Sequence, residues 1–144
     1  MKKLLVLFLL ILALGCSKDD EPGLDPIIGN FRIVEASMNG EKMELEYCQD
    51  LFTMDFFLFN MGTYTLYGDS IGGNCEANTI ADLYWERNGK NYTITSDIPF
   101  FDGTIVPTNS APATLKNNVL TITINYGGLD LKMVYRKLNP KPGN

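Results

Sequence analysis

Apolar and polar residues alternate along most of the chain between Ile27 and Leu138, and short turn segments separate the alternating runs. A period of two residues is typical of a β-strand with one buried face, and no segment here keeps the 3.6-residue period of a helix over three turns. The cleanest run, Val119–Tyr126, has apolar side chains at alternate positions: Leu120, Ile122, Ile124 and Tyr126. The pattern therefore predicts antiparallel strands without crossover helices.

Asparagine and glycine mark the turns between these strands. The turn segments are Asn39-Gly40, Asn60-Met61-Gly62, Asn88-Gly89, Asn117-Asn118 and Gly127-Gly128. A two-residue Asn-Gly loop favours a type I′ hairpin, because both central residues need a positive φ. We therefore expect a type I′ hairpin at Asn88-Gly89, between the strand that holds Trp85 and the strand that holds Tyr92.

Some segments depart from the alternation. Residues 41–47 form a weak, acidic second strand that leads to Cys48. Phe57 and Phe59 interrupt the polar face of the strand that begins at Phe52, so we expect the end of that strand to be covered on both faces.

Glycine and proline predict two irregular regions. Residues 68–79 contain three glycines, which predict a loop. Residues 97–112 hold three prolines, and proline cannot donate to a strand ladder, so we expect a short edge strand at 100–106 flanked by loop. The tail 139–144 contains two prolines and is expected to be disordered.

Eight or nine short strands joined by successive hairpins predict an all-β, antiparallel domain over residues 27–138. Sequential hairpins favour an eight-stranded up-and-down barrel over a Greek key. A β-sandwich is the alternative, because the alternation by itself does not determine whether the sheet closes.

The first residues follow a different pattern. Two lysines precede an unbroken apolar run of 11 residues, Leu4–Leu14. At ~1.5 Å per residue this run is too short for the ~30 Å hydrocarbon core of a membrane, so it predicts a secretory signal peptide over residues 1–15. Cys16 follows Leu-Gly directly, which resembles the lipobox that bacterial signal peptidase II cuts before an acylated cysteine. Ala13 stands where that motif usually has Leu, Val or Ile.

The lipobox resemblance implies that Cys16 is lipidated and becomes the N-terminus. Residues 16–26 then form a flexible tether, rich in polar residues and proline. The acidic tract 18–21 resembles the export signal that one group of Gram-negative bacteria uses for surface lipoproteins. We therefore expect an outer-membrane lipoprotein exposed on the cell surface; the alternative is a periplasm-facing one.

Charge and histidine content exclude several functions. Loss of Lys2 and Lys3 with the signal peptide leaves 10 of the 12 basic side chains against 17 acidic ones, a net charge near −7. An acidic surface argues against nucleic acid or anionic lipid as partners. The chain has no histidine, which excludes Ser-His-Asp and Cys-His catalysis and ordinary histidine-containing zinc sites.

Three cysteines are present, and the lipid uses Cys16. This leaves Cys48 and Cys75 as a pair in an oxidising compartment, where a disulfide is the default. Two free or metal-bound thiols are the alternative, which the absence of nearby ligands disfavours. We expect no metal and no cofactor.

Four short motifs lie along the predicted strands: the strand Gly29–Val34, the Phe-rich hairpin Phe56–Thr65, Trp85 on a mid-chain strand, and Tyr135-Arg136 on the final strand. Together they resemble the lipocalin-like domains of bacterial lipoproteins. The resemblance implies a calycin-type barrel, in which a first-strand aromatic packs on a basic side chain of the last strand. That pair is Phe31 with Arg136, although this family usually has Trp where Phe31 stands.

The alternation predicts that one set of side chains faces the barrel interior: Phe56, Leu66, Leu83, Trp85, Tyr92, Ile122, Ile124, Met133 and Tyr135. An eight-stranded barrel is wide enough either to be filled by side chains or to hold one small ligand. The first hypothesis is therefore a lipid-anchored protein that binds a small apolar or amphipathic ligand. The second is a filled barrel that contacts another protein through its loops, as an accessory subunit or inhibitor.

Carboxylate pairs are the remaining candidates for catalysis. Asp97 with Asp102, or Glu44 with Glu46, could in principle cleave a glycoside, but only their proximity in sequence supports this. Solvated surface charge accounts for them more simply, so we expect the protein not to be an enzyme.

Overall fold

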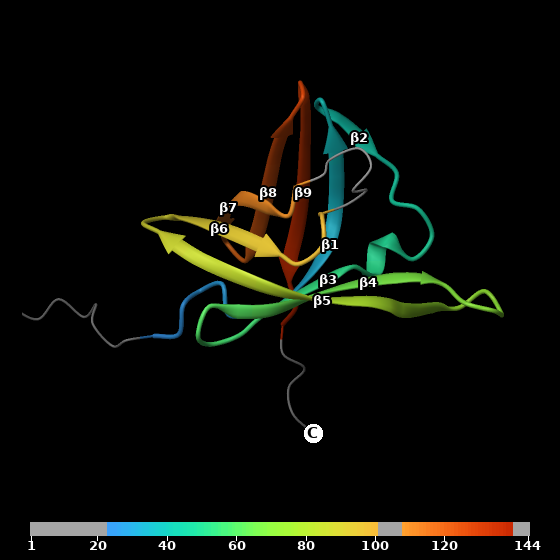
Figure 1. Cartoon of the computed structure of the whole chain (residues 1–144), viewed down its shortest axis with the longest axis horizontal. Coiled ribbons are helices and arrows are strands. Elements are labelled where there is room, and N and C mark those ends of the chain that lie inside the picture. Colours follow the sequence, from blue (N-terminus) through green and yellow to red (C-terminus); the bar gives the residue numbers. More distant parts are fainter. Residues whose placement is uncertain (1–22, 101–107, 140–144) are drawn as a thin grey trace, which may run out of the picture.

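The computed structural model describes residues 23–100 and 108–139 (Figure 1). These residues form nine strands and one short 3₁₀ helix. In chain order they are β1 (Gly29–Met38), β2 (Glu41–Met43), η1 (Gln49–Leu51), β3 (Thr53–Phe56), β4 (Met61–Asp69), β5 (Cys75–Asn88), β6 (Asn91–Ser96), β7 (Ser110–Lys116), β8 (Val119–Tyr126) and β9 (Leu129–Lys137).

The sheet closes on itself. From β3 to β9 each strand pairs antiparallel with the next, and β1 pairs with both β3 and β9. The closing ladder of β1 and β9 runs from the pair Phe31–Lys137 to the pair Met38–Leu131. Eight strands thus form an up-and-down barrel, as the hairpin order predicted, and the sandwich alternative is wrong.

The second strand of the barrel is split in two. The same edge of β1 pairs with β3 over Gly29–Arg32 and with β2 over Ala36–Met38. The predicted strand over residues 41–47 therefore ends at Met43, and residues 44–52 bulge outward and carry η1 before β3 begins.

The hairpin turns follow the asparagine and glycine positions. Asn39-Gly40, Asn117-Asn118 and Gly127-Gly128 all have positive φ at both residues, as a type I′ turn requires. The hairpin of β5 and β6 is present, but its central residues are Gly89 and Lys90, because Asn88 pairs with Asn91. Of these two only Gly89 has a positive φ, so the turn is type II′ and the predicted type I′ turn is wrong.

The turn between β3 and β4 lies earlier than predicted. Phe59 and Asn60 both have a φ of 62°, and β4 already begins at Met61. Phe57 and Phe59 are exposed, so the expected cover on both faces is wrong. The chain leaves the sheet at Phe57, and the alternation therefore does not continue to Phe59.

Both predicted irregular regions contain strand. β4 and β5 extend through most of residues 68–79 and leave a loop only at 70–74. β7 includes Pro112, which pairs with Thr93 of β6, whereas the pairing of β7 with β8 starts one residue later, at Ala113. Proline fits there because its missing N–H has no ladder to join on the β8 side. The predicted edge strand at 100–106 and the tail 140–144 lie almost wholly outside the described residues.

The barrel has two distinct ends. We call the end with the β3–β4, β5–β6 and β7–β8 turns the closed end, since Ile27 lies fully buried where the chain enters it. The opposite end, with the β1–β2, β4–β5 and β8–β9 turns, is the mouth. Phe100, in the segment after β6, is also fully buried and belongs to the same core cluster as Ile27.

Candidate functional site

The residues predicted to face the interior lie in one cluster. Eight of the nine are buried members of the core, and the ninth, Leu66, is partly buried and packs against it. The structure therefore brings the predicted set together, on the inner face of β3, β4, β5, β6, β8 and β9. That these residues line a ligand stays a prediction.

These interior side chains pack against one another. Leu83, Ile122, Met133 and Tyr135 have an exposed fraction of 0%. Aromatic rings meet in edge-on or tilted pairs, including Phe31 with Phe56 at 5.7 Å between ring centroids. A core at normal packing density leaves few voids larger than a water molecule. The described wall is thus in van der Waals contact with other side chains.

Phe100 occupies the mouth side of this core. Its ring lies 5.9 Å from the ring of Tyr64, and the Tyr64 ring lies 6.5 Å from that of Phe52. The Phe100 N–H donates to Thr108 O (3.2 Å), which ties the two described flanks of the β6–β7 connection together. An apolar side chain from a connecting segment therefore fills space inside the barrel wall.

The polar atoms of two large interior side chains, Trp85 and Tyr135, have protein partners. Trp85 Nε1 donates to the carbonyl oxygens of Phe57 and Met61, at 3.3 and 3.2 Å. Burial, together with the hydrogen bond to Tyr64, raises the pKa of Tyr135 well above its usual value. Buried Tyr and Trp require such partners, and here neighbouring protein groups provide them.

A segment before β1 seals the closed end. Asp25 accepts hydrogen bonds from the Ile27 N–H (3.0 Å) and the Tyr92 hydroxyl (2.7 Å), and it pairs with Arg87 at 3.1 Å. Burial raises the pKa of the Asp25 carboxyl, but these hydrogen bonds and the Arg87 charge outweigh burial, so the pKa lies below 3.8. Burial and the Asp25 carboxylate raise the pKa of Tyr92 to about 12.

The predicted pair of Phe31 with Arg136 is wrong. Lys137 Nζ lies 5.6 Å from the centre of the Phe31 ring and donates to Pro26 O at 2.8 Å. Directly opposed residues of an antiparallel pair project to the same face, and the register opposes Phe31 to Lys137. Arg136 opposes Arg32, and both are exposed on the outer face.

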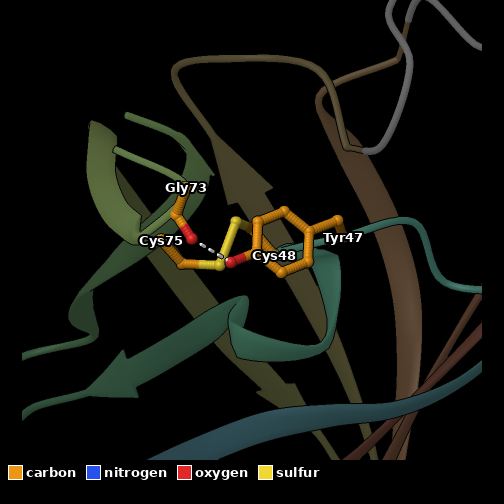
Figure 2. The surroundings of a disulfide bond; sticks show 4 residues. All are labelled: Tyr47, Cys48, Gly73 and Cys75. Atoms are coloured by element: carbon orange, nitrogen blue, oxygen red, sulfur yellow. Dashed lines mark hydrogen bonds between the residues drawn. A yellow bond between two sulfur atoms is a disulfide. The ribbon is translucent and has the colours of Figure 1, made fainter. Parts of the chain in front are cut away.

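A disulfide braces the mouth. Cys48 and Cys75 are joined, with 5.4 Å between their Cα atoms, which confirms the predicted bridge. Figure 2 shows that Tyr47 lies beside the bridge, and its hydroxyl donates to the carbonyl oxygen of Gly73. The outward bulge between β2 and β3 is therefore fixed covalently to the start of β5, beside the loop 70–74.

Apolar side chains surround the mouth. Six of them are partly buried and pack on the core: Met38, Met43, Leu45, Leu66, Tyr67 and Ile98. We call this set the rim. A surface hollow of about 360 Å³ lies beside the β1–β2 hairpin, where Met38 and Met43 contribute to its walls together with Glu41 and Lys42. Tyr47 and Ile71, at the braced side of the mouth, are strongly exposed.

Catalytic and metal candidates do not gain support from the geometry. Glu44 and Glu46 are exposed, and Asp102 lies outside the described residues, as do Cys16 and the acidic tract 18–21. Within residues 23–100 and 108–139, no group of three or more His, Cys, Asp or Glu side chains is placed to hold a metal ion. The same part of the chain contains no helix long and apolar enough to span a membrane.

Comparisons with known proteins find a likeness in backbone shape alone. No protein-family model matches the sequence, and no curated protein does. Two crystal structures are similar in backbone. One is a lipocalin-like protein from Bacteroides uniformis ATCC 8492, with a TM-score of 0.48, 12% identity, and coverage of 77% of this chain and 97% of that one. The other is an uncharacterized protein from Bacteroides eggerthii DSM 20697, with a TM-score of 0.46, 15% identity, and coverage of 77% and 98%.

Proposed function

We propose that the protein is a lipid-anchored, outer-membrane lipoprotein on the cell surface, whose lipocalin-like barrel binds another protein at its mouth. The packed interior is the observation that supports a protein partner over a ligand held inside the barrel. The absence of histidine and the exposed positions of Glu44 and Glu46 support a role without catalysis.

The direction of the chain supports this arrangement. Ile27 is buried at the closed end, and Gly29 begins β1 there, so a tether from Cys16 leads to that end of the barrel. The mouth lies at the other end of every long strand. An anchored barrel of this kind presents its mouth to whatever lies beyond the membrane.

The mouth has the properties of a preorganised binding surface. The disulfide and the Tyr47–Gly73 hydrogen bond hold two segments together there, and the exposed side chains of Tyr47 and Ile71 lie beside them. Aromatic residues are enriched in protein interfaces, and a surface that is already rigid loses less conformational entropy on binding.

A small apolar ligand lying on the rim is the second candidate. The six partly buried rim residues support it, because they include two methionines, whose flexible side chains adapt to irregular ligands. Such a ligand would rest in the mouth and would not enter the packed interior.

Photo-crosslinking in intact cells tests the protein partner. A benzoylphenylalanine at position 71 should give one discrete adduct, whereas the same group at position 34, an exposed site on the outer wall of β1, should give none. Adducts at both positions, or at neither, would contradict a partner at the mouth.

Titration of the mature protein with 1-anilinonaphthalene-8-sulfonate separates the ligand alternatives. A protein that binds only a partner should give no saturable fluorescence. Saturable binding that a Met38→Ser, Met43→Ser variant abolishes would establish the second candidate. Saturable binding that survives this variant would indicate an interior ligand and overturn the packed interior.

The anchor has its own test. The intact mass after membrane extraction should show loss of residues 1–15 and gain of acyl chains, and a Cys16→Ser variant should leave the membrane. Replacement of residues 18–21 by alanine should keep the lipid but reduce protease accessibility on whole cells. An unmodified mass would refute the anchor, and unchanged accessibility would refute the export role of the tract.

A further inference from the structure

Exposed apolar side chains gather at one corner of the closed end. Three of them, Phe57, Leu58 and Phe59, lie in the β3–β4 turn; Met61 begins β4, and Tyr84 lies on β5. Their exposed fractions run from 46% for Tyr84 to 85% for Phe59. We call these five residues the hairpin tip. A contiguous apolar patch of this kind on a small domain is typical of a contact surface.

The backbone holds the tip in place. Met61 and Tyr84 are directly opposed across β4 and β5, and the Phe57 N–H donates to Met61 O at 2.7 Å. Asn60 bonds to Trp85 twice: its side-chain amide donates to Trp85 O (2.8 Å), and its own carbonyl accepts from the Trp85 N–H (3.0 Å). The tip is therefore displayed on a fixed turn.

Phe59 is an unusual residue for its backbone conformation. Its φ is 62°, in the left-handed region where bulky side chains are uncommon and glycine or asparagine is favoured. The turn thus carries an aromatic side chain at a position where a small residue would be less strained. An aromatic that is both strained and exposed is consistent with a contact outside the barrel.

The tip carries no charge. No Asp, Glu, Lys or Arg occurs between Asp55 and Asp69. Burial of charged groups in an apolar medium is costly, whereas the tip can enter such a medium without that cost. Aromatic and aliphatic side chains of this kind are typical of segments that lie in a membrane interface.

The tip lies beside the place where the tethered chain enters the barrel. Gly29 of β1 pairs with Phe56, the residue directly before the tip. Figure 1 shows the segment before β1 and the β3–β4 turn together at the left of the view. Seven residues, 16–22, separate the described chain from the end of the signal peptide, and at ~3.3–3.6 Å each they span at most ~25 Å.

We propose that the hairpin tip inserts into the headgroup and acyl boundary of the lipid leaflet that holds the Cys16 anchor. The proposal rests on the proposed lipidation of Cys16, because the short tether then keeps the tip within reach of that leaflet. Lipid anchoring is more stable with two membrane contacts than with one, and the tip is the second. Insertion at this corner also directs the mouth away from the membrane.

The sole tryptophan makes the insertion measurable. Trp85 Nε1 donates to two carbonyls of the tip, so its ring lies directly behind the turn. The lipidated, mature protein is reconstituted into vesicles of phosphatidylcholine and phosphatidylethanolamine, with or without brominated acyl chains. Bromine quenches tryptophan only at short range. We expect brominated vesicles to quench Trp85, and a Phe57→Ser, Phe59→Ser variant to lose roughly half or more of this quenching.

A matched pair of exposed residues at the other end is the control. A Tyr47→Ser, Ile71→Ser variant changes two exposed apolar side chains at the mouth and should be quenched as strongly as the parent. Absence of quenching in the parent, or equal quenching in the parent and the tip variant, would overturn the proposal and leave the tip as a contact for a protein.

The intact mass of the protein distinguishes failure of the tip contact from failure of the lipid anchor. A lipidated protein that is not quenched refutes the tip contact and leaves the proposed function standing. A protein without lipid refutes the anchor, and the tip is then tested by adding that protein to preformed brominated vesicles. Quenching there that depends on Phe57 and Phe59 supports the tip contact, and its absence overturns it.

Discussion

At the closed end of the barrel, the segment before β1 is held by noncovalent contacts, whereas at the mouth a covalent bond joins segments 27 residues apart in sequence. The closed end buries Ile27 and ties Asp25 to Tyr92 and Arg87. At the mouth the second strand of the barrel is interrupted. Only the three-residue strand β2 pairs with β1 there, over Ala36–Met38.

The difference shows how a small barrel compensates for a broken ladder. Where strands pair without interruption, apolar burial and backbone hydrogen bonds are sufficient. Where the second strand leaves the sheet, residues 44–52 bury only Cys48 and Phe52 fully and Leu45 in part. The disulfide there reduces the conformational freedom of the unfolded chain. The two ends should therefore respond differently to mutation and to reduction.

The largest expected loss of stability comes from a mutation that creates a cavity near the closed end. Trp85→Ala should lower the free energy of unfolding by about 3–5 kcal/mol, because Trp85 is buried and its indole fills the packed interior. Tyr84→Ala, at the next position on the outer face, should cost less than about 1 kcal/mol. Urea denaturation followed by circular dichroism measures both. Equal, small losses would mean that the interior is open at Trp85.

Removal of the mouth disulfide should give the next largest loss of stability. A Cys48→Ala, Cys75→Ala variant should lose up to about 3.5 kcal/mol, by loop-closure entropy for a loop of this length. Denaturation of the parent with and without dithiothreitol gives a second estimate from the unmutated sequence. If both leave the free energy of unfolding unchanged, the disulfide does not stabilise the mouth.

A smaller loss of stability is expected when the contacts of Asp25 at the closed end are removed. Asp25→Asn should cost about 1 kcal/mol at pH 7, because it removes the charge that pairs with Arg87 and strengthens the hydrogen bond from Tyr92. The pKa of Asp25 is lowered by folding, so its carboxylate stabilises the protein above pH ~3.9, and this stabilisation is lost as the pH falls through the lowered pKa. The difference between parent and variant should shrink as the pH falls below ~3.9 and through the lowered pKa of Asp25; a constant difference would exclude the charge as its cause.

The smallest effect distinguishes two neighbouring cations of β9. Lys137→Met should cost about 0.5–1 kcal/mol through its contact with the Phe31 ring. Arg136→Met should cost close to zero, because its side chain is exposed on the outer face. A larger loss for the Arg136 variant would restore the pairing that the resemblance to lipocalin-like domains implied.

Much of the fold could be predicted from the sequence because its signals are local. Alternation identified the inward positions of β8 and β9, and asparagine and glycine located three of the five hairpin turns correctly and a fourth to within one residue. The bridge of Cys48 and Cys75 followed from cysteine parity together with the predicted export. Each of these signals spans a few residues or concerns composition alone, so no tertiary context was needed.

The errors have a different origin, since most of them depend on contacts between strands. The partner of Phe31 is set by the register of β1 against β9, and that ladder has an irregularity between Ile33 and Glu35 that neither strand's pattern indicates. Pro112 is tolerated in β7 only because of where the ladder with β8 begins. The sequence does not indicate that the hairpin tip is exposed, because a run of aromatic residues ordinarily predicts burial.

The claim that the two ends are held independently is tested most directly by native-state hydrogen exchange of the mature protein, with the disulfide intact and reduced. We expect reduction to speed amide exchange in residues 44–52 and 66–79, at the mouth, and to leave residues 83–95 at their original rates. Faster exchange across the whole barrel, or no change at the mouth, would contradict the claim.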